Sequence, residues 1–308
     1  MAEASERTTG GEGRTRLLLR ALAIVLALAA AYFAFVWLQL ENTQSRGAEI
    51  EKNANGAILS LNAGINLLRE NPGSAPEIAP QLETTRKTLD ELAQSVGQLN
   101  ASVLPPGADA RRAYRDALRS YVSDIEGYNS ELTTTTALVA ARTETVKKVS
   151  EGFAQLEKLS DPGITEASVS ATLRGVKAAV DASLDSLRSI SASATTVYSS
   201  EALIARLSAI SAVVDELVKS LQAKEQGRLD GAVRSFAQLM NGDWQSLFLQ
   251  YDMRGLGKLA TNMRGLSERR EKVSGAQKSV VSAQKLTGLL GLACFLGALV
   301  SAGIARWR

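Results

Sequence analysis

Histidine is absent from this 308-residue chain, and cysteine occurs once. Histidine is the commonest general base and metal ligand, so its absence excludes the usual di-iron helical bundle, which needs a Glu-x-x-His motif on two helices. One cysteine excludes an intrachain disulfide and a thiolate metal cluster. The sequence also lacks a phosphate-binding Gly-x-x-x-x-Gly-Lys-Ser/Thr loop and a nucleophile elbow. We therefore expect no enzyme activity and no cofactor.

Proline and aromatic residues are scarce as well. The six prolines fall in three clusters, at 72–80, 105–106 and 162, and aromatic residues make up 5% of the chain. Proline breaks helix interiors, so these clusters mark connections between helices. No stretch alternates apolar and polar residues as a strand would, and 45% apolar residues suffice for a packed core. The composition predicts an all-α protein.

Two long apolar runs, Ala21–Leu40 and Leu286–Ala305, stand near the chain ends. Each has twenty residues, and a helix crosses the hydrocarbon core of a bilayer in about 20. We expect a cytoplasmic flank (1–20), a first transmembrane helix (21–40), an extracytoplasmic domain (41–285), a second transmembrane helix (286–305) and a cytoplasmic tail (306–308). A cleaved signal peptide ending near Ala29–Ala31 is the alternative for the first run.

Basic flanks set the expected orientation. Arg14, Arg16 and Arg20 precede the first run, and Arg306 and Arg308 follow the second, so the positive-inside tendency places both ends in the cytoplasm of a bacterial inner membrane. The first twenty residues carry four arginines and three glutamates, a net charge of +1, and the tail adds +2. The whole chain is +3, which leaves 41–285 neutral. The basic balance therefore belongs to membrane flanks, and we expect no nucleic-acid partner.

Small residues spaced four apart occur in both runs and let helices approach closely in lipid. They are Ala23, Ala27 and Ala31 in the first run, and Ala293, Gly297, Ser301 and Ala305 in the second. Close helix packing is one interpretation of these stripes, and the general abundance of alanine is the other.

Between the runs, apolar residues recur with a mean period near 3.5, as in coiled coils and bundles. Thr85, Thr135 and Arg142 occupy polar positions on this seam. The apolar seam positions are Ile78, Leu82, Leu89, Leu92, Val96, Leu99 and Val103; Tyr114, Leu118, Tyr121, Ile125, Tyr128, Leu132, Val139, Val146, Val149, Phe153 and Leu156; Val169, Leu173, Val176, Val180, Leu187 and Ile190; Leu203, Leu207, Ile210, Val214, Leu217 and Leu221; Leu229, Val233, Phe236 and Met240; and Leu256, Leu259, Met263, Leu266, Val273 and Val280.

The spacing of breaks predicts six antiparallel helices in an elongated bundle, and the helix lengths predict that this bundle consists of two stacked modules. The first module contains four helical segments: the helices at about 41–71 and 77–103, the start of a third helix (108–160) and the end of the last helix (243–285). The second module holds the remainder of these two long helices with the fourth and fifth. A run of four threonines, Thr133–Thr136, weakens the third helix and is a possible hinge.

Arg115, Arg119 and Tyr121 are the first candidate contact residues. They lie in the most arginine-rich segment, where cations beside aromatic rings could hold a carboxylate or phosphate. The plainer interpretation makes the tyrosines seam residues and the arginines a solvated shoulder near a membrane-proximal loop.

Arg142 and Trp244 complete the candidate ligand or partner contacts. A buried arginine needs a partner or water, so Arg142 could mark a ligand cavity, a register-setting pair or a frayed interface. Trp244 lies near Phe248 and Tyr251, just after the expected membrane-distal turn at Gly242. Such an aromatic cluster suits partner contact or fills the cap of a bundle.

Two short segments, Glu41-Asn42-Thr43-Gln44-Ser45 and Lys52-Asn53-Ala54, resemble the start of the sensory region of type IV pilus chemoreceptors. The order of span, long helical region and span also resembles the input half of bacterial chemoreceptors and sensor kinases. Those receptors continue into a signalling domain, whereas here Arg306–Arg308 follow the second run. The resemblance implies a sensor-like region without its own output domain.

These features predict a membrane-anchored helical protein that acts as a sensor-like or scaffolding subunit through a membrane-protein partner. A purely structural envelope spacer or assembly factor, including a phage or secretion component, is the alternative. The expected partners are membrane lipid, another membrane protein and a second copy of the chain, since heptad seams also serve homodimers.

Overall fold

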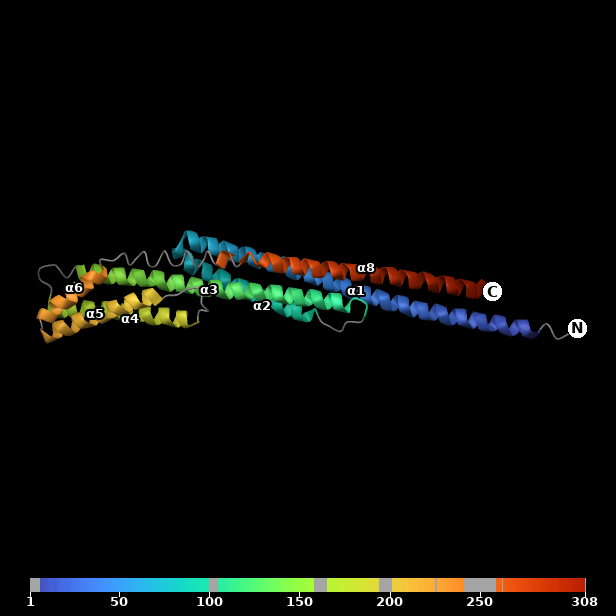
Figure 1. The fold of residues 1–308 in the computed structure, drawn as a ribbon, viewed down its shortest axis with the longest axis horizontal. Helices are drawn as coiled ribbons and strands as arrows, with labels where there is room; N and C mark the ends of the chain where they lie inside the picture. The colour runs from blue at the N-terminus through green and yellow to red at the C-terminus, as the bar shows by residue number, and fades with distance from the viewer. Residues whose placement is uncertain are drawn as a thin grey trace. The chain divides into compact units, whose positions relative to one another are not determined.

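The computed structural model describes residues 6–99, 105–157, 165–193, 201–224, 226–240, 259–261 and 263–307. Within these ranges every regular element is a helix and no strand occurs, which confirms the all-α prediction. The elements are α1 (Glu6–Glu70), η1 (Pro72–Ser74), α2 (Ala75–Gln98), α3 (Ala108–Glu157), α4 (Glu166–Ser193), α5 (Glu201–Ala223), α6 (Gln226–Met240) and α8 (Leu266–Trp307) (Figure 1).

The chain divides into two compact units. Unit 1 comprises Met1–Asn55, Asp90–Asp124 and Leu266–Arg308, and unit 2 comprises Gly56–Leu89 and Ile125–Gly265. The division cuts through α1, α2 and α3, so each of these helices contributes to both units. The sequence-based prediction divided the third helix between the two modules, but it kept the helices at 41–71 and 77–103 whole in one module and so did not anticipate the division of α1 and α2.

In unit 1, α1 and α8 run alongside each other, with the start of α1 and the end of α8 at the same end (Figure 1). Both are long and apolar enough to cross a membrane. Small residues allow the approach: a Cβ added at Gly291 would lie 3.3 Å from the Cβ of Phe33, and one at Gly297 would lie 3.2 Å from Leu26 Cδ1. Ser301 and Ala305 are buried, whereas Ala27 and Ala31 are exposed. The predicted stripe of α8 therefore takes part in the contact more fully than the stripe of α1.

The remainder of unit 1 is built on the predicted seam. Leu92, Val96, Leu99, Tyr114, Leu118 and Tyr121 are all buried, as are Val273 and Val280 of α8. Gly107 precedes α3 with a φ of +106°, a region that favours glycine. A Cβ at this position would also lie 3.2 Å from both terminal carbons of Leu40 and 3.5 Å from Ala283 Cβ. Gly107 thus lies beside both α1 and α8.

An apolar cluster of unit 2 lies where α4, α5 and α6 pack with the later part of α3. The cluster includes Leu138 and the predicted seams of α4 and α5, among them Leu173, Val180, Leu207 and Val214. One seam prediction was wrong: Val233 of α6 is 51% exposed, and its neighbour Ala232 is 6% exposed instead. In so short a helix Ala232 and Val233 differ by only 100° of rotation, so apolar spacing alone could not choose between them.

Connections between helices follow the predicted breaks, with one addition. Asn71 caps η1, its Oδ1 accepting a hydrogen bond from Gly73 N at 3.0 Å, and Pro72 takes the first helical position. The break between α5 and α6 was not predicted; there Lys224 has a φ of +56°. The predicted turns at 161–163 and 241–243 lie outside the described residues.

Candidate functional site

A polar stretch of α3 is enclosed in unit 2. Asn129, Thr135, Thr136, Arg142 and Thr145 are each 2% exposed or less. Buried polar groups lower stability unless they are hydrogen-bonded, so a bundle core is normally apolar. We treat this stretch, from Asn129 to Thr145, as the candidate site and refer to it as the polar segment of α3.

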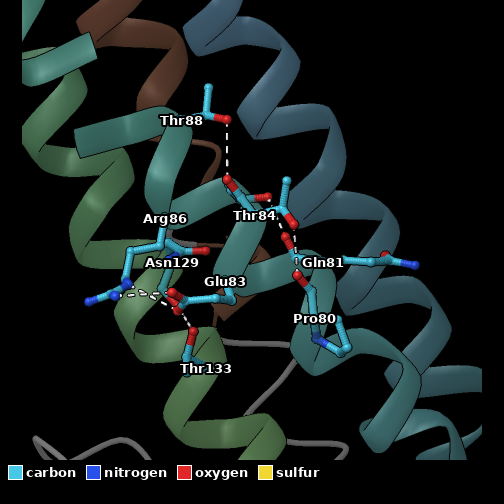
Figure 2. Close-up of polar contacts among 9 residues, drawn as sticks. Pro80, Gln81, Glu83, Thr84, Arg86, Thr88, Asn129 and Thr133 are labelled. Atoms are coloured by element: carbon cyan, nitrogen blue, oxygen red, sulfur yellow. Dashed lines mark hydrogen bonds and ion pairs between the residues drawn. The ribbon is translucent and has the colours of Figure 1, made fainter. Parts of the chain in front are cut away.

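Most threonines of the polar segment satisfy their own hydroxyl groups. Thr133 Oγ1 donates to the Asn129 carbonyl at 2.8 Å, and Figure 2 shows this bond together with equivalent bonds in α2. Thr135 and Thr145 likewise donate four residues back, at 2.8 and 2.7 Å. Because such a bond pairs the hydroxyl with a carbonyl of its own helix, the hydroxyl needs no hydrogen-bond partner from a neighbouring helix. The threonine run is therefore helical throughout, and its role as a hinge stays a prediction.

Two buried atoms of the polar segment, Asn129 Oδ1 and Thr136 Oγ1, have no hydrogen-bond partner in the part of the chain that the structure describes. Glu131 Oε1 is in the same situation, and burial raises the pKa of its carboxyl group. A hydroxyl, an amide oxygen and a carboxyl within two turns of one helix can accept or donate hydrogen bonds to a small polar ligand or to water.

Arg142 was predicted to occupy a seam position, and it is 2% exposed. Its guanidinium belongs to the same buried stretch of α3 as Thr145, so cationic and neutral polar groups share the interior of unit 2. A guanidinium offers five donors to a planar anion. Ligand contact by Arg142 stays a prediction.

The structure separates the other candidates instead of bringing them together. Arg119 is exposed, and Arg115 forms a 3.0 Å ion pair with Asp116, whose side chain is 54% exposed. Tyr121 points inward: it is 1% exposed, and its hydroxyl donates to Asn55 Oδ1 at 2.8 Å. This arrangement matches the plainer interpretation, with tyrosines in the seam and arginines outside it.

Tyr114, one turn before Leu118, is an aromatic residue enclosed in the interior of unit 1. It is fully buried, and its ring lies so close to Gly47 that an added Cβ would overlap it. Burial, assisted by the charge of Glu51, raises the pKa of Tyr114 to about 12. Glu51 itself forms an ion pair with Arg270 of α8 at 3.5 Å. Tyr114 is therefore a neutral packing residue at physiological pH.

Trp244, with Phe248 and Tyr251, lies outside the described residues. Its predicted partner contact is accordingly untested. In unit 1, Arg269 Nε of α8 lies 2.8 Å from Asp124 Oδ2.

An apolar groove of about 620 Å³ lies along α1 and α8 in unit 1. Small residues form much of its wall, and Phe33, Trp37, Leu292 and Phe295 contribute larger apolar side chains. The lining residues are Ala27, Ala30, Ala31, Phe33, Ala34, Trp37, Thr287, Gly288, Gly291, Leu292 and Phe295. Its position between the two apolar helices suits hydrocarbon contact.

Sequence reasoning missed Asn129, Glu131 and Gly47. The seam prediction contains Tyr128, whereas its neighbour Asn129 is the more buried of the two. Both fit the spacing between Ile125 and Leu132, so a polar seam residue beside an aromatic one is the signal that could have been used. Gly47 gives no signal in one sequence.

Comparisons with known proteins identify no relative: no family model, no curated protein and no solved structure matches this chain.

Proposed function

We propose that this chain is a two-pass protein of a bacterial inner membrane, with both ends in the cytoplasm and the intervening region outside it. The supporting observation is the exposure of apolar side chains along α1 and α8. Leu17 is 71% exposed, Leu28 67%, Leu289 66% and Val300 61%. Apolar surfaces of this extent are stable only when another apolar phase covers them, and both helices are long enough to cross a bilayer.

We further propose that the protein acts as a sensor-like or scaffolding subunit through a membrane-protein partner. The unbroken helices support this role. α1 is 65 residues long and joins its apolar segment to both units without a break, and α8 is a single helix of 42 residues that includes the second apolar segment. A helix without a break carries a rotation or shift from one end to the other, so a change of packing outside the membrane would reach the spans.

The polar segment of α3 favours this role over that of a passive spacer. A spacer requires length and stability, which an apolar seam supplies best. Asn129, Thr136 and Arg142 occupy buried positions where apolar residues would be more stabilising. Binding of a polar ligand or of a partner side chain would supply hydrogen bonds to the buried oxygens of Asn129 and Thr136 and would thereby alter the packing of unit 2.

Cross-linking between the spans tests the proposal. In a chain carrying Cys294→Ser, cysteines at Leu26 and Gly297 report span packing, because a Cβ at Gly297 lies 3.2 Å from Leu26 Cδ1. For a sensor-like protein we expect Arg142→Leu to change the yield of this cross-link in membranes. The matched control is Arg174→Leu, since Arg174 is an exposed arginine of unit 2.

If Arg142→Leu raises stability and leaves the cross-link unchanged, the spacer is the better account. A thermal-shift screen of the full chain in detergent adds a direct test of ligand binding. A small molecule that binds the folded state raises the unfolding midpoint with concentration. That shift should disappear in Arg142→Leu and persist in Arg174→Leu.

A further inference from the structure

The glycine contacts between α1 and α8 fix which residues lie at the same depth. Added Cβ atoms at Gly297, Gly291 and Gly288 meet Leu26, Phe33 and Trp37 respectively. Continuing this antiparallel register toward the chain ends places Arg306 at the level of Leu17, next to Arg16. From Leu17 to Trp37 is about 30 Å at 1.5 Å per residue, the thickness of a bilayer hydrocarbon core. On the proposed two-pass arrangement, the far edge of the hydrocarbon core therefore lies near Trp37 and Gly288.

The connection before α3 reaches this edge. The hydroxyl of Tyr32 donates a hydrogen bond to the carbonyl of Pro105, and Gly107 packs beside Leu40 and Ala283. A backbone carbonyl near hydrocarbon must have a donor, and Tyr32 provides one. The first turn of α3 accordingly begins at the membrane surface, where lipid headgroups lie.

Cations outnumber carboxylates in the layer just beyond the edge. The layer contains residues 38–46 of α1, 108–116 of the α3 start and 278–285 of α8, which Gly107 connects through Leu40 and Ala283. Its carboxylates are Glu41, Asp109 and Asp116, and Asp116 is paired with Arg115. Its cations are Arg46, Arg111, Arg112, Arg115, Lys278 and Lys285, which we name the basic collar.

The direction of the helices turns two parts of the collar toward the lipid. α1 and α3 run the same way, since Tyr121 bonds Asn55 while Gly107 packs on Leu40. Both therefore leave the membrane at this edge, and helical side chains tilt toward the N-terminus, here back toward the bilayer. Arg46 and Arg112 are exposed and can extend their guanidinium groups to the surface.

We propose that the basic collar binds the phosphate groups of anionic phospholipids in the extracytoplasmic leaflet. The positive-inside tendency disfavours basic residues on the extracytoplasmic side of the membrane. Binding of an anionic partner there would explain the basic residues of the collar. Guanidinium groups pair with phosphate through two hydrogen bonds, and each basic residue near an anionic surface adds attraction. Bound headgroups would hold the base of unit 1 at a fixed height on the membrane.

Lipid selectivity of the full chain provides the test. The protein is reconstituted in phosphatidylcholine vesicles, and the motionally restricted fraction is measured by electron paramagnetic resonance for spin-labelled phosphatidylglycerol and spin-labelled phosphatidylcholine. We expect a preference for phosphatidylglycerol that falls about two- to five-fold in the triple variant Arg46→Gln, Arg112→Gln, Lys285→Gln. The cytoplasmic arginines contribute equally to the lipid preference of the unmodified chain and of the triple variant. The difference in preference between the two proteins therefore measures the contribution of the basic collar.

The matched control carries Arg69→Gln, Lys87→Gln and Arg174→Gln, three exposed cations of unit 2, and should keep the preference of the unmodified chain. A charge-retaining variant, Arg46→Lys with Arg112→Lys, should keep most of it. An unchanged preference in the triple variant overturns the inference, as does a native chain without selectivity. The inference rests on the proposed two-pass arrangement, and alkaline carbonate separates the two: a chain extracted by carbonate refutes that arrangement, whereas an integral but unselective chain refutes only the collar.

Discussion

At the scale of single residues, two glycines of α1 make opposite predictions. Gly47 lies against the Tyr114 ring, whereas a Cβ at Gly56 meets no atom within 4 Å. We expect Gly47→Ala to lower the free energy of unfolding by about 1–3 kcal/mol, because Tyr114 must move in a packed interior. Gly56→Ala should raise it by about 0.5–1 kcal/mol, because alanine loses less backbone entropy in a helix.

Both glycine variants are measured by urea unfolding of the full chain in detergent, followed by circular dichroism. Replacement of the Tyr114 ring by a smaller side chain provides the control. Gly47→Ala combined with Tyr114→Leu should recover part of the loss, since leucine leaves room for the added methyl. Equal effects of Gly47→Ala and Gly56→Ala would show that Tyr114 does not pack on Gly47.

The buried carboxyl of Glu131 makes stability depend on pH. Burial raises the pKa of Glu131 above its usual value of 4.5. The folded chain therefore holds a proton where the unfolded chain has released it, and the free energy of unfolding falls as pH rises from 4.5 through the raised pKa. We expect Glu131→Gln to raise the thermal midpoint at pH 7 and to leave it nearly unchanged at pH 4.

Thermal unfolding of the full chain between pH 4 and pH 7 measures this effect. Glu151→Gln is the control, because Glu151 is an exposed carboxylate of the same helix and should show no such gain at pH 7. A midpoint for Glu131→Gln that stays equal to that of the native chain at pH 7 would place Glu131 in contact with water.

A buried residue can be predicted from the sequence when the periodicity of its own helix fixes its position. Tyr114, Tyr121 and Arg142 were foreseeable as buried because a seven-residue spacing fixes one face of a helix. Gly47 and Gly107 were not, because a close approach between helices depends on the partner opposite, which one sequence does not reveal.

At the scale of elements, the contact between α1 and α8 depends on small residues. A Cβ at Gly291 would lie 3.3 Å from Phe33 Cβ and 3.9 Å from the Ala30 carbonyl oxygen. We expect Gly291→Ile to weaken the pairing by about 1–3 kcal/mol through overpacking. Gly303→Ile is the matched control on α8, because no atom lies within 4 Å of its added Cβ.

Cross-linking of cysteines at Leu26 and Gly297 in the Cys294→Ser chain measures the pairing in membranes. The yield should fall in Gly291→Ile and stay constant in Gly303→Ile. A similar yield in all three proteins would mean that α1 and α8 do not pair through their glycines. The groove beside the two helices should then be an unspecific lipid surface.

Some helix boundaries could be predicted from sequence patterns, and others could not. The break at Asn71 was predicted, because Asn, Pro and Gly each have a distinct backbone preference and stand together there. The break at Lys224 was not, since lysine has no preference for a positive φ and the tertiary packing of α5 and α6 imposes it. The same lack of a fixed pattern explains the exposed Val233.

At the scale of the whole molecule, the residues at which the chain divides into two units could not be foreseen from the sequence. Helix lengths imply more than one layer, but the boundary at Asn55 and Asp124 depends on contacts among helices far apart in sequence. The polar segment of α3 and the two apolar helices nevertheless lie within one chain whose helices are continuous. A two-pass arrangement is the condition under which the remaining proposals operate.

Labelling of single cysteines tests that arrangement. In the Cys294→Ser chain produced in a bacterial host, Asn71→Cys should react with a membrane-impermeant maleimide in intact spheroplasts, because Asn71 follows α1 beyond the predicted first span. Trp307→Cys should react only after permeabilisation, since it adjoins Arg306, which the two-pass proposal places at the cytoplasmic edge. Reaction of both in intact cells would contradict the cytoplasmic ends. A mature chain that begins after Ala31 would instead favour the signal peptide, and α8 alone would then anchor the protein.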